Sequence, residues 1–195
     1  MGKIVCLMGK SSSGKDTIYK RLLKQDNIKL KEIVTYTTRP IRAGEKDGVE
    51  YHFTDDAEYI KLLRDGSVIE SRLYNTCNGD WRYFTVADKD LDLSSQSYIM
   101  ITTLEGYRKI SEFYGKEKVV PLMIELDDGI RLQRALDREK VQDRPRYEEM
   151  CRRFLADAGD FSIENLKDAG IMQKFNNNDL EQCLFDIITY LKANI

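Results

Sequence analysis

A glycine-rich loop near the start of the chain has the residue types and spacing of a phosphate-binding loop. Gly9 is followed by four residues and then by Gly14 and Lys15, between a predicted strand at residues 3–8 and a predicted helix at residues 16–25. The glycines allow successive main-chain N–H groups to face a phosphate, and the start of the helix adds a favourable dipole. A lysine at this position places its charge on the β- and γ-phosphates. The predicted nucleoside triphosphate site consists of Gly9, Lys10, Ser11, Ser12, Ser13, Gly14, Lys15, Asp16 and Thr17.

The residue after the lysine departs from this pattern, which has Ser or Thr there to hold Mg²⁺. Asp16 stands at that position instead. A carboxylate is a good Mg²⁺ ligand but a poor neighbour for a bare phosphate. Two interpretations are open. Asp16 coordinates Mg²⁺, directly or through water, or Asp16 only caps the helix while Thr17 supplies the hydroxyl group on the phosphate side.

A second polar loop, predicted at residues 36–50, carries residues suited to one phosphate monoester. Arg39 and Arg42 lie three positions apart and can make forked contacts with a single phosphate. Glu45 can orient an arginine, and Tyr51 adds a hydroxyl group. The combination predicts a second site, for a monophosphorylated molecule, beside the triphosphate.

A third group of basic residues lies in two predicted helices of the second half. Arg134 and Arg138 are four positions apart and share one face of a helix that Asp127 caps, and Arg152 and Arg153 follow on the next helix. Phosphoryl transfer needs such charges because its transition state spreads negative charge over three oxygens. The alternative is an ordinary basic helix surface, which we favour for Arg152 alone.

The elements that must position these residues follow a simple pattern. Strands and helices alternate at both ends of the chain, which predicts a parallel sheet covered on both faces. The middle of the chain carries hairpin signals, including a turn at Asn78 and Gly79, and predicts an inserted lobe. Expected helices are 16–25, 55–66, 104–114, 127–139, 147–164 and 179–193; expected strands are 3–8, 30–35, 51–53, 68–74, 81–85, 98–101, 119–126 and 171–175.

Composition excludes several classes of protein. The chain has 195 residues, 42% of them hydrophobic and 33% charged, and no apolar run long enough to cross a membrane. A net charge of −2 gives no general support for nucleic-acid binding. The cysteines are scattered and a single histidine accompanies them, so a zinc cluster is not expected. With no signal segment recognised, we expect a cytoplasmic protein that is a monomer or a homodimer, with no nucleic-acid or membrane partner.

The segment from Thr37 to Phe53 resembles the acceptor-binding loop of guanylate kinases. It matches every fixed position of T-T-R-x-x-R-x-G-E-x-x-G-x-x-Y-x-F, and the resemblance runs over the full chain. It implies a P-loop kinase fold of three α/β/α layers, with a parallel core sheet (1–34, 96–126 and 165–195), an inserted mixed α/β acceptor-binding lobe (about 35–95) and a helical lid (about 127–164). It also implies the ATP-dependent phosphorylation of GMP to GDP, with Mg²⁺ accompanying ATP and Asp16 as its ligand.

The resemblance further implies a role for each matching residue. GMP would bind to Thr35, Arg39, Arg42, Glu45, Tyr51, Glu70, Tyr83, Thr85 and Thr103. Catalysis would depend on Lys15, Arg39, Arg134, Arg138 and Arg153, and Asn177 would lie on the adenine side of ATP. A carboxylate such as that of Glu70 can accept from guanine N1–H and the 2-amino group together, whereas adenine has no such pair of donors. By itself, Glu70 also fits a strand residue that faces solvent.

The chain departs from the family at several positions. The family carries Asp-x-Asp before the helix predicted at 104–114, where this chain has Ile101, Thr102 and Thr103. Phe84 replaces a small glycine, and Lys10 and Ser12 replace the usual Pro and Gly of the phosphate loop. Two alternative functions therefore stay open: a P-loop kinase acting on a different phosphorylated small molecule, and a catalytically weak guanylate-kinase-like binding module.

Overall fold

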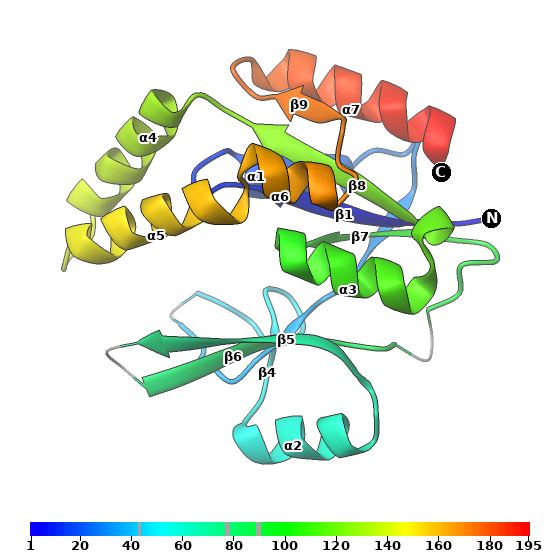
Figure 1. Cartoon of the computed structure of the whole chain (residues 1–195), viewed down its shortest axis with the longest axis horizontal. Coiled ribbons are helices and arrows are strands. Elements are labelled where there is room, and N and C mark those ends of the chain that lie inside the picture. The colour runs from blue at the N-terminus through cyan, green and yellow to red at the C-terminus, as the bar shows by residue number, and fades with distance from the viewer. Residues whose placement is uncertain (43, 77–78, 89–90) are drawn as a thin grey trace.

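A computed structural model describes residues 1–42, 44–76, 79–88 and 91–195 of the chain. It contains a core sheet of five strands and a separate sheet of four strands (Figure 1). All pairings in the core sheet are parallel, as predicted. In spatial order its strands are β2 (Leu30–Glu32), β7 (Ser97–Ile101), β1 (Ile4–Gly9), β8 (Val119–Glu125) and β9 (Lys174–Asn176).

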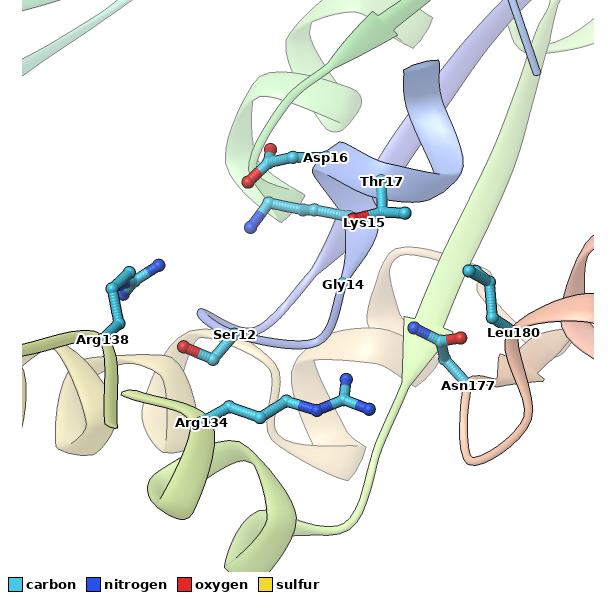
Figure 2. A pocket seen from close by; sticks show the side chains of 9 residues that line it. All are labelled: Ser12, Gly14, Lys15, Asp16, Thr17, Arg134, Arg138, Asn177 and Leu180. Atoms are coloured by element: carbon cyan, nitrogen blue, oxygen red, sulfur yellow. The ribbon is translucent and has the colours of Figure 1, made fainter. Parts of the chain in front are cut away.

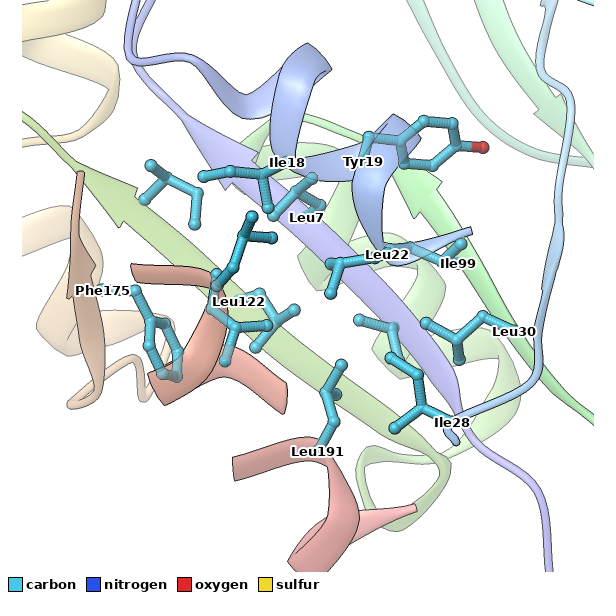
Figure 3. Close-up of a cluster of buried hydrophobic side chains, with 14 of the residues drawn as sticks. Leu7, Ile18, Tyr19, Leu22, Ile28, Leu30, Ile99, Leu122, Phe175 and Leu191 are labelled. Atoms are coloured by element: carbon cyan, nitrogen blue, oxygen red, sulfur yellow. The ribbon is translucent and has the colours of Figure 1, made fainter. Parts of the chain in front are cut away.

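Helices cover both faces of the core sheet, which confirms the expected three-layer arrangement. One face carries α1 (Lys15–Leu22) and α7 (Leu180–Asn194), and the other carries α3 (Leu104–Tyr114) and α6 (Ile163–Asp168). Every residue of β1 is buried. Successive side chains of the strand alternate between two clusters of buried apolar residues. Val5 and Leu7 belong to the first cluster, in which Figure 3 shows Leu7, whereas Ile4, Cys6 and Met8 belong to the second. A short 3₁₀ turn, η1 (Lys116–Lys118), connects α3 to β8.

The second sheet belongs to the inserted lobe and mixes parallel with antiparallel pairs. In spatial order its strands are β4 (His52–Phe53), β3 (Tyr36–Thr37), β6 (Gly79–Val86) and β5 (Val68–Thr76), with α2 (Asp56–Arg64) beside them (Figure 1). The prediction that the polar loop begins at residue 36 was wrong. Tyr36 and Thr37 form β3 because Phe84 and Tyr83 of the distant strand β6 pair with them.

The two long strands of the lobe form an antiparallel hairpin with a register shift. Val68 pairs with Val86 but Glu70 pairs with Thr85, so Ile69 is an extra residue in β5. Such a bulge changes which side chains face the core. Of the turn predicted between these strands, Asn78 lies outside the described residues, and Gly79 begins β6.

The lid segment contains two helices of its own, α4 (Asp128–Lys140) and α5 (Tyr147–Asp160), which extend away from one end of the core sheet (Figure 1). The prediction of one helix over 147–164 was wrong. The chain turns after Asp160, and the Ser162 hydroxyl caps α6 by accepting the Asn165 N–H. The last strand, expected at 171–175, lies at Lys174–Asn176.

Within the described ranges, no helix is both long enough and apolar enough to span a membrane. The boundaries given above for core, lobe and lid stay a prediction.

Candidate active site

A pocket of about 430 Å³ opens at the carboxyl end of β1, where parallel strands commonly present ligand sites. The phosphate loop, α1, α4 and the segment after β9 supply its walls (Figure 2). The residues that line it are Ser12, Gly14, Lys15, Asp16, Thr17, Arg134, Arg138, Asn177 and Leu180. The structure thus brings together most of the predicted triphosphate site, two of the lid arginines and Asn177.

Gly14 has a conformation that the loop needs and other residues tolerate poorly. Its φ of 87° lies in the left-handed region, and a Cβ atom there would collide with the amide of Asn177. The Asn177 side chain is buried and donates from Nδ2 to the carbonyl oxygen of Ser13 at 2.7 Å. Asn177 therefore stabilises the conformation of the phosphate loop through this hydrogen bond.

The ammonium group of Lys15 lies in this pocket without a fixed anionic partner. Among the described residues, no ion pair joins Lys15 to a carboxylate. Burial lowers the pKa of Lys15, Asp16 and Asp157 oppose that effect, and Arg153 and Arg138 add to it. A polyphosphate bound here would supply the missing negative charge.

Asp16 does not cap α1. The cap residue is Gly14, and among the described residues no side chain accepts a capping hydrogen bond at that helix start. Asp16 is exposed in the first turn, and its side chain leaves the helix next to that of Lys15 (Figure 2). The capping interpretation was therefore wrong, and Asp16 as a metal ligand stays a prediction.

The lid arginines behave differently from one another. Arg134 and Arg138 line the pocket from α4, and Arg134 extends towards Asn177 (Figure 2). Arg153 donates from Nη2 to the Ser11 hydroxyl at 3.4 Å. Arg152 instead makes two 2.7 Å hydrogen bonds to Glu149 on the exposed face of α5, as expected for a surface residue.

Sequence reasoning missed an ion pair of the lid, between Arg131 and Asp157, whose two members also bond to the main chain of the phosphate loop. Arg131 is 1% exposed and donates from Nη1 to the carbonyl oxygen of Ser11 at 2.8 Å, while the Ser11 N–H donates to Asp157 at 2.7 Å. Arg131 also contacts Asp157 at 3.4 Å and Asp128 at 3.0 Å, and its guanidinium lies 4.7 Å from the centre of the Phe154 ring. No motif contains Arg131 or Asp157, and their contacts with Ser11 join segments more than 100 positions apart.

The acceptor loop carries its own ion pair. Arg39 is 3% exposed and makes two hydrogen bonds to the Glu45 carboxylate, at 2.9 and 3.0 Å. Glu45 also accepts the main-chain N–H of Arg42 at 2.8 Å. The hydrogen bonds from Arg39, the largest influence, hold the pKa of Glu45 below its ordinary value. The side chain of Arg42 stays exposed, whereas that of Arg39 is fixed against the Tyr51 ring at 5.5 Å.

Tyr51 and Tyr83 join this loop to the hairpin. Their rings lie 5.5 Å apart in an edge-on arrangement. Burial raises the pKa of Tyr51, the neighbouring Tyr83 adds to the effect, and Asp16 contributes in the same direction.

The bulge in β5 directs Glu70 inward, towards Thr85. The Glu70 carboxylate is buried and accepts from the Thr85 hydroxyl at 2.7 Å. The solvent-facing alternative for Glu70 was therefore wrong. Arg72, which sequence reasoning also missed, donates to both carboxylate oxygens of Glu70 and to the Thr103 hydroxyl.

The other two threonines expected in the acceptor site, Thr35 and Thr103, have structural contacts as well. Thr103 caps α3 by accepting the Gly106 N–H at 3.2 Å. Thr35 accepts the His52 N–H at 2.9 Å through its main-chain carbonyl oxygen. A larger cavity, of about 780 Å³, lies between the hairpin and α3, and Arg72 and Thr103 are among the residues that line it.

Comparisons with known proteins agree with this architecture. The guanylate kinase family model matches residues 1–79. A guanylate kinase of Mycoplasma mobile is 30% identical over 207 aligned residues, covering 100% of this chain and 94% of that protein. A guanylate kinase of Schizosaccharomyces pombe is 34% identical over 108 residues, and that match spans about half of each chain, 55% and 52% respectively. The crystal structure of guanylate kinase from Anaplasma phagocytophilum superposes with a TM-score of 0.65 at 26% identity, covering 98% of this chain and 85% of that one.

A phosphate loop on a parallel sheet, an inserted lobe with a paired arginine and two lid arginines in the donor pocket together define a nucleoside monophosphate kinase. The 30% identity over nearly the whole length of a relative decides the family. The chain belongs to the guanylate kinase family, whose reaction is the ATP-dependent phosphorylation of GMP to GDP. The family expected from the sequence is thereby confirmed.

Proposed function

We propose that this chain transfers the γ-phosphoryl group of ATP to GMP, through the residues described above. The observation that carries the proposal is the pocket that combines the phosphate loop with Lys15, Arg134 and Arg138. An oxygen of the GMP phosphate attacks the γ-phosphorus of ATP, and the bond to the β,γ-bridging oxygen breaks to release ADP. No covalent enzyme intermediate is required, because alignment and electrostatic stabilisation carry the reaction.

Two groups of cations would serve the two ends of this reaction. Lys15 and the main chain of the loop hold the β- and γ-phosphates, while Arg134, Arg138 and Arg153 neutralise the charge that develops on the transferred group. On the acceptor side, the GMP phosphate binds to Arg39, Arg42, Tyr51 and Tyr83. Burial of Arg39 and its two bonds to Glu45 favour a preorganised phosphate contact.

Guanine would be read by Glu70 and Thr85, with Thr35 and Thr103 at the edges of the base pocket. On the donor side, Asn177 and Leu180 lie where a base attached to the triphosphate can pack. Among the described residues, the buried Oδ1 atom of Asn177 has no hydrogen-bond donor. An exocyclic amino group such as that of adenine would satisfy it.

The residues of the donor pocket fit Mg²⁺ bound together with ATP. Magnesium in kinases is held by one or two carboxylates, by substrate phosphates and by water, so a full cage of protein ligands is not needed. Asp16 offers such a carboxylate beside Lys15, and the described part of the chain has no cluster of three acidic, His or Cys ligands that would compete. The bound ion would supply positive charge to the phosphates.

A second candidate is a kinase for another phosphorylated acceptor. It is favoured by the segment from Ile101 to Thr103, which lacks both acids of the family's Asp-x-Asp, and by Arg72 beside Glu70. The intact phosphate loop argues against the third possibility, a catalytically weak binding module. A cytoplasmic location and a monomeric or homodimeric state remain predictions.

An ADP-release assay with GMP, dGMP, AMP, CMP and UMP as acceptors tests the proposal. We expect turnover with GMP at a kcat/KM at least about 100-fold above that with AMP, because adenine leaves the buried Glu70 carboxylate without donors. Arg82→Leu serves as a control, since Arg82 pairs with Asp56 on the α2 side of the hairpin. If none of the monophosphates is turned over, the proposed function is contradicted. Preference for an acceptor other than GMP would favour the second candidate function, a kinase for another phosphorylated acceptor.

A further inference from the structure

Glu70 is already occupied in this structure by a side chain of its own strand. Arg72 donates from Nε to Oε2 of Glu70 at 3.1 Å and from Nη2 to Oε1 at 3.3 Å. The Thr85 hydroxyl adds a third hydrogen bond, to Oε1 at 2.7 Å. Since each carboxylate oxygen has two lone pairs, Oε1 has no capacity left and Oε2 has one site left.

The pair of donors that Arg72 presents has the same chemistry as the edge of guanine. In both groups two N–H bonds point the same way from a planar N–C–N unit, and both bind a carboxylate in a fork. The Glu70 side chain is 3% exposed and that of Arg72 is 18% exposed, so little water competes for these bonds. Guanine N1–H and its 2-amino group cannot both reach Glu70 while Arg72 stays in place.

We propose that Arg72 is an internal competitor for guanine, which must leave Glu70 before GMP binds and thereby sets base affinity and selectivity. This inference rests on the proposed function of Glu70 as the guanine-reading residue. A base with a single suitable donor, such as hypoxanthine, needs to displace only one of the two Arg72 bonds. The competition therefore weakens the binding of GMP more than that of IMP, and it reduces the difference in affinity between the two nucleotides.

The cavity next to Arg72 offers the displaced guanidinium another place to bind. Glu105 and Asp160 line this cavity of about 780 Å³ together with Arg72. Within the described residues, neither carboxylate takes part in a hydrogen bond or an ion pair, whereas the nearby Lys109 is paired with Glu112. Burial raises the pKa of Asp160, and Asp157 and Glu105 add to it, as expected for a carboxylate that lacks a cation. Rotation of Arg72 away from Glu70 would leave its guanidinium in the cavity that Glu105 and Asp160 line.

Gly106 shows how tightly the Glu70 side of the site is packed. A Cβ atom on Gly106 would lie 3.6 Å from the carboxyl carbon of Glu70 and would collide with the Thr102 hydroxyl. Glu70 is thus held against the start of α3, while Arg72 lines an open cavity. When GMP arrives, Arg72 is the partner that has room to move.

Steady-state kinetics of Arg72→Met test the competition. We expect the KM for GMP to fall about three- to tenfold, the KM for IMP to fall less, and kcat with GMP to change less than twofold. Arg82→Met is the matched control, because Arg82 lies on the neighbouring strand and pairs with Asp56 away from this site. An unchanged or raised KM for GMP in a folded Arg72→Met enzyme would overturn the proposal.

Two further measurements keep the test decisive if Arg72→Met folds poorly. The Nε–H resonance of Arg72, assigned by its loss in Arg72→Lys, should move towards the range of free arginine as GMP is added to the wild-type enzyme. A resonance that stays at its ion-paired position at saturating GMP would contradict the displacement. Turnover of the wild-type enzyme with GMP is measured first, so that failure of the proposed function can be told from failure of this inference. No turnover with GMP would contradict the proposed function. Turnover with GMP together with an unchanged Arg72 resonance would contradict only the inference about Arg72.

Discussion

The donor pocket and the acceptor lobe hold their cations in opposite ways. Around the phosphate loop, Lys15, Arg134 and Arg138 line one pocket, and no ion pair engages them within the described residues. In the acceptor lobe, the two guanidinium groups that lie inward are each paired with a carboxylate, Arg39 with Glu45 and Arg72 with Glu70. The cations of the donor pocket are thus available to a ligand, whereas the guanidinium groups of the acceptor lobe are neutralised by carboxylates before any ligand binds.

The difference matches the two substrates proposed. A triphosphate carries enough negative charge to compensate several unpaired cations, and their mutual repulsion favours its binding. A monophosphate with a base to be recognised needs orientation more than charge, and a paired guanidinium is held in one geometry. The affinity for the triphosphate should therefore depend on the unpaired cations of the donor pocket. The selectivity for the base should depend on how the ion-paired groups of the acceptor lobe exchange one another for the substrate.

The largest effect is expected from Lys15→Ala, which removes a free cation from the donor side only. We expect kcat to fall about 10³-fold or more, because the charge that holds the transferred phosphoryl group is lost. Binding of GMP should change by less than about threefold, since the substitution leaves Arg39, Arg42 and the Arg39–Glu45 ion pair of the acceptor lobe intact. Steady-state kinetics and calorimetric titration with GMP check both parts, and an equal loss of GMP affinity would break the separation of the two regions.

The next effect concerns the ion pair between Arg131 of α4 and Asp157 of α5, both of which also bond to the Ser11 main chain of the phosphate loop. Arg131→Leu should lower the free energy of unfolding by about 3 kcal/mol, because Asp157 keeps a partly buried charge without its partner. Urea denaturation measures the change. Arg131→Leu combined with Asp157→Leu should recover part of the loss, and Arg21→Leu, in an exposed pair with Glu181, should cost less than about 1 kcal/mol.

Arg152 and Arg153 are adjacent in the lid, and only Arg152 forms an ion pair among the described residues. Arg153→Ala should lower kcat about 10- to 100-fold, because Arg153 reaches Ser11 of the phosphate loop. Arg152→Ala should leave kcat within about twofold, since Arg152 is bound to Glu149 on the exposed face of α5. The two variants differ by one position in the chain, so similar kinetics for both would contradict the role given to Arg153.

The smallest effect tests the paired side through pH. The pKa of Glu45 lies below its ordinary value of 4.5, chiefly because of the bonds from Arg39, so the folded protein binds protons at Glu45 more weakly than the unfolded chain. The carboxylate therefore contributes stability above pH about 4.5, and that stability is lost as the pH falls through the lowered pKa. The free energy of unfolding of the wild type should exceed that of Glu45→Gln by about 1 kcal/mol at pH 7. The denaturation curves of the two proteins should converge in acid. A constant difference from pH 7 to pH 3 would exclude this account.

Much of the site could be predicted because its residues lie in two short segments. The loop from Gly9 to Thr17 forms where a strand meets a helix, and Arg39 pairs with Glu45 only six positions away. Local spacing fixes such contacts, since few residues separate the partners. Alternating strands and helices likewise determined the parallel sheet and its covered faces.

Only the tertiary structure decided the partners of the remaining charges. The Ser11 main chain meets Arg131 and Asp157 across 120 and 146 positions, and Asn177 meets Ser13 across 164. The pairing of Glu70 with Arg72 is close in sequence, but the bulge at Ile69 decides which face both side chains share. A one-residue shift in a strand reverses inward and outward positions, and no local pattern in this sequence predicted it. The sequence alone determined which chemical groups the site contains, and folding determined which of them are free to meet a ligand, because pairing of charges depends on distances between segments far apart in the chain.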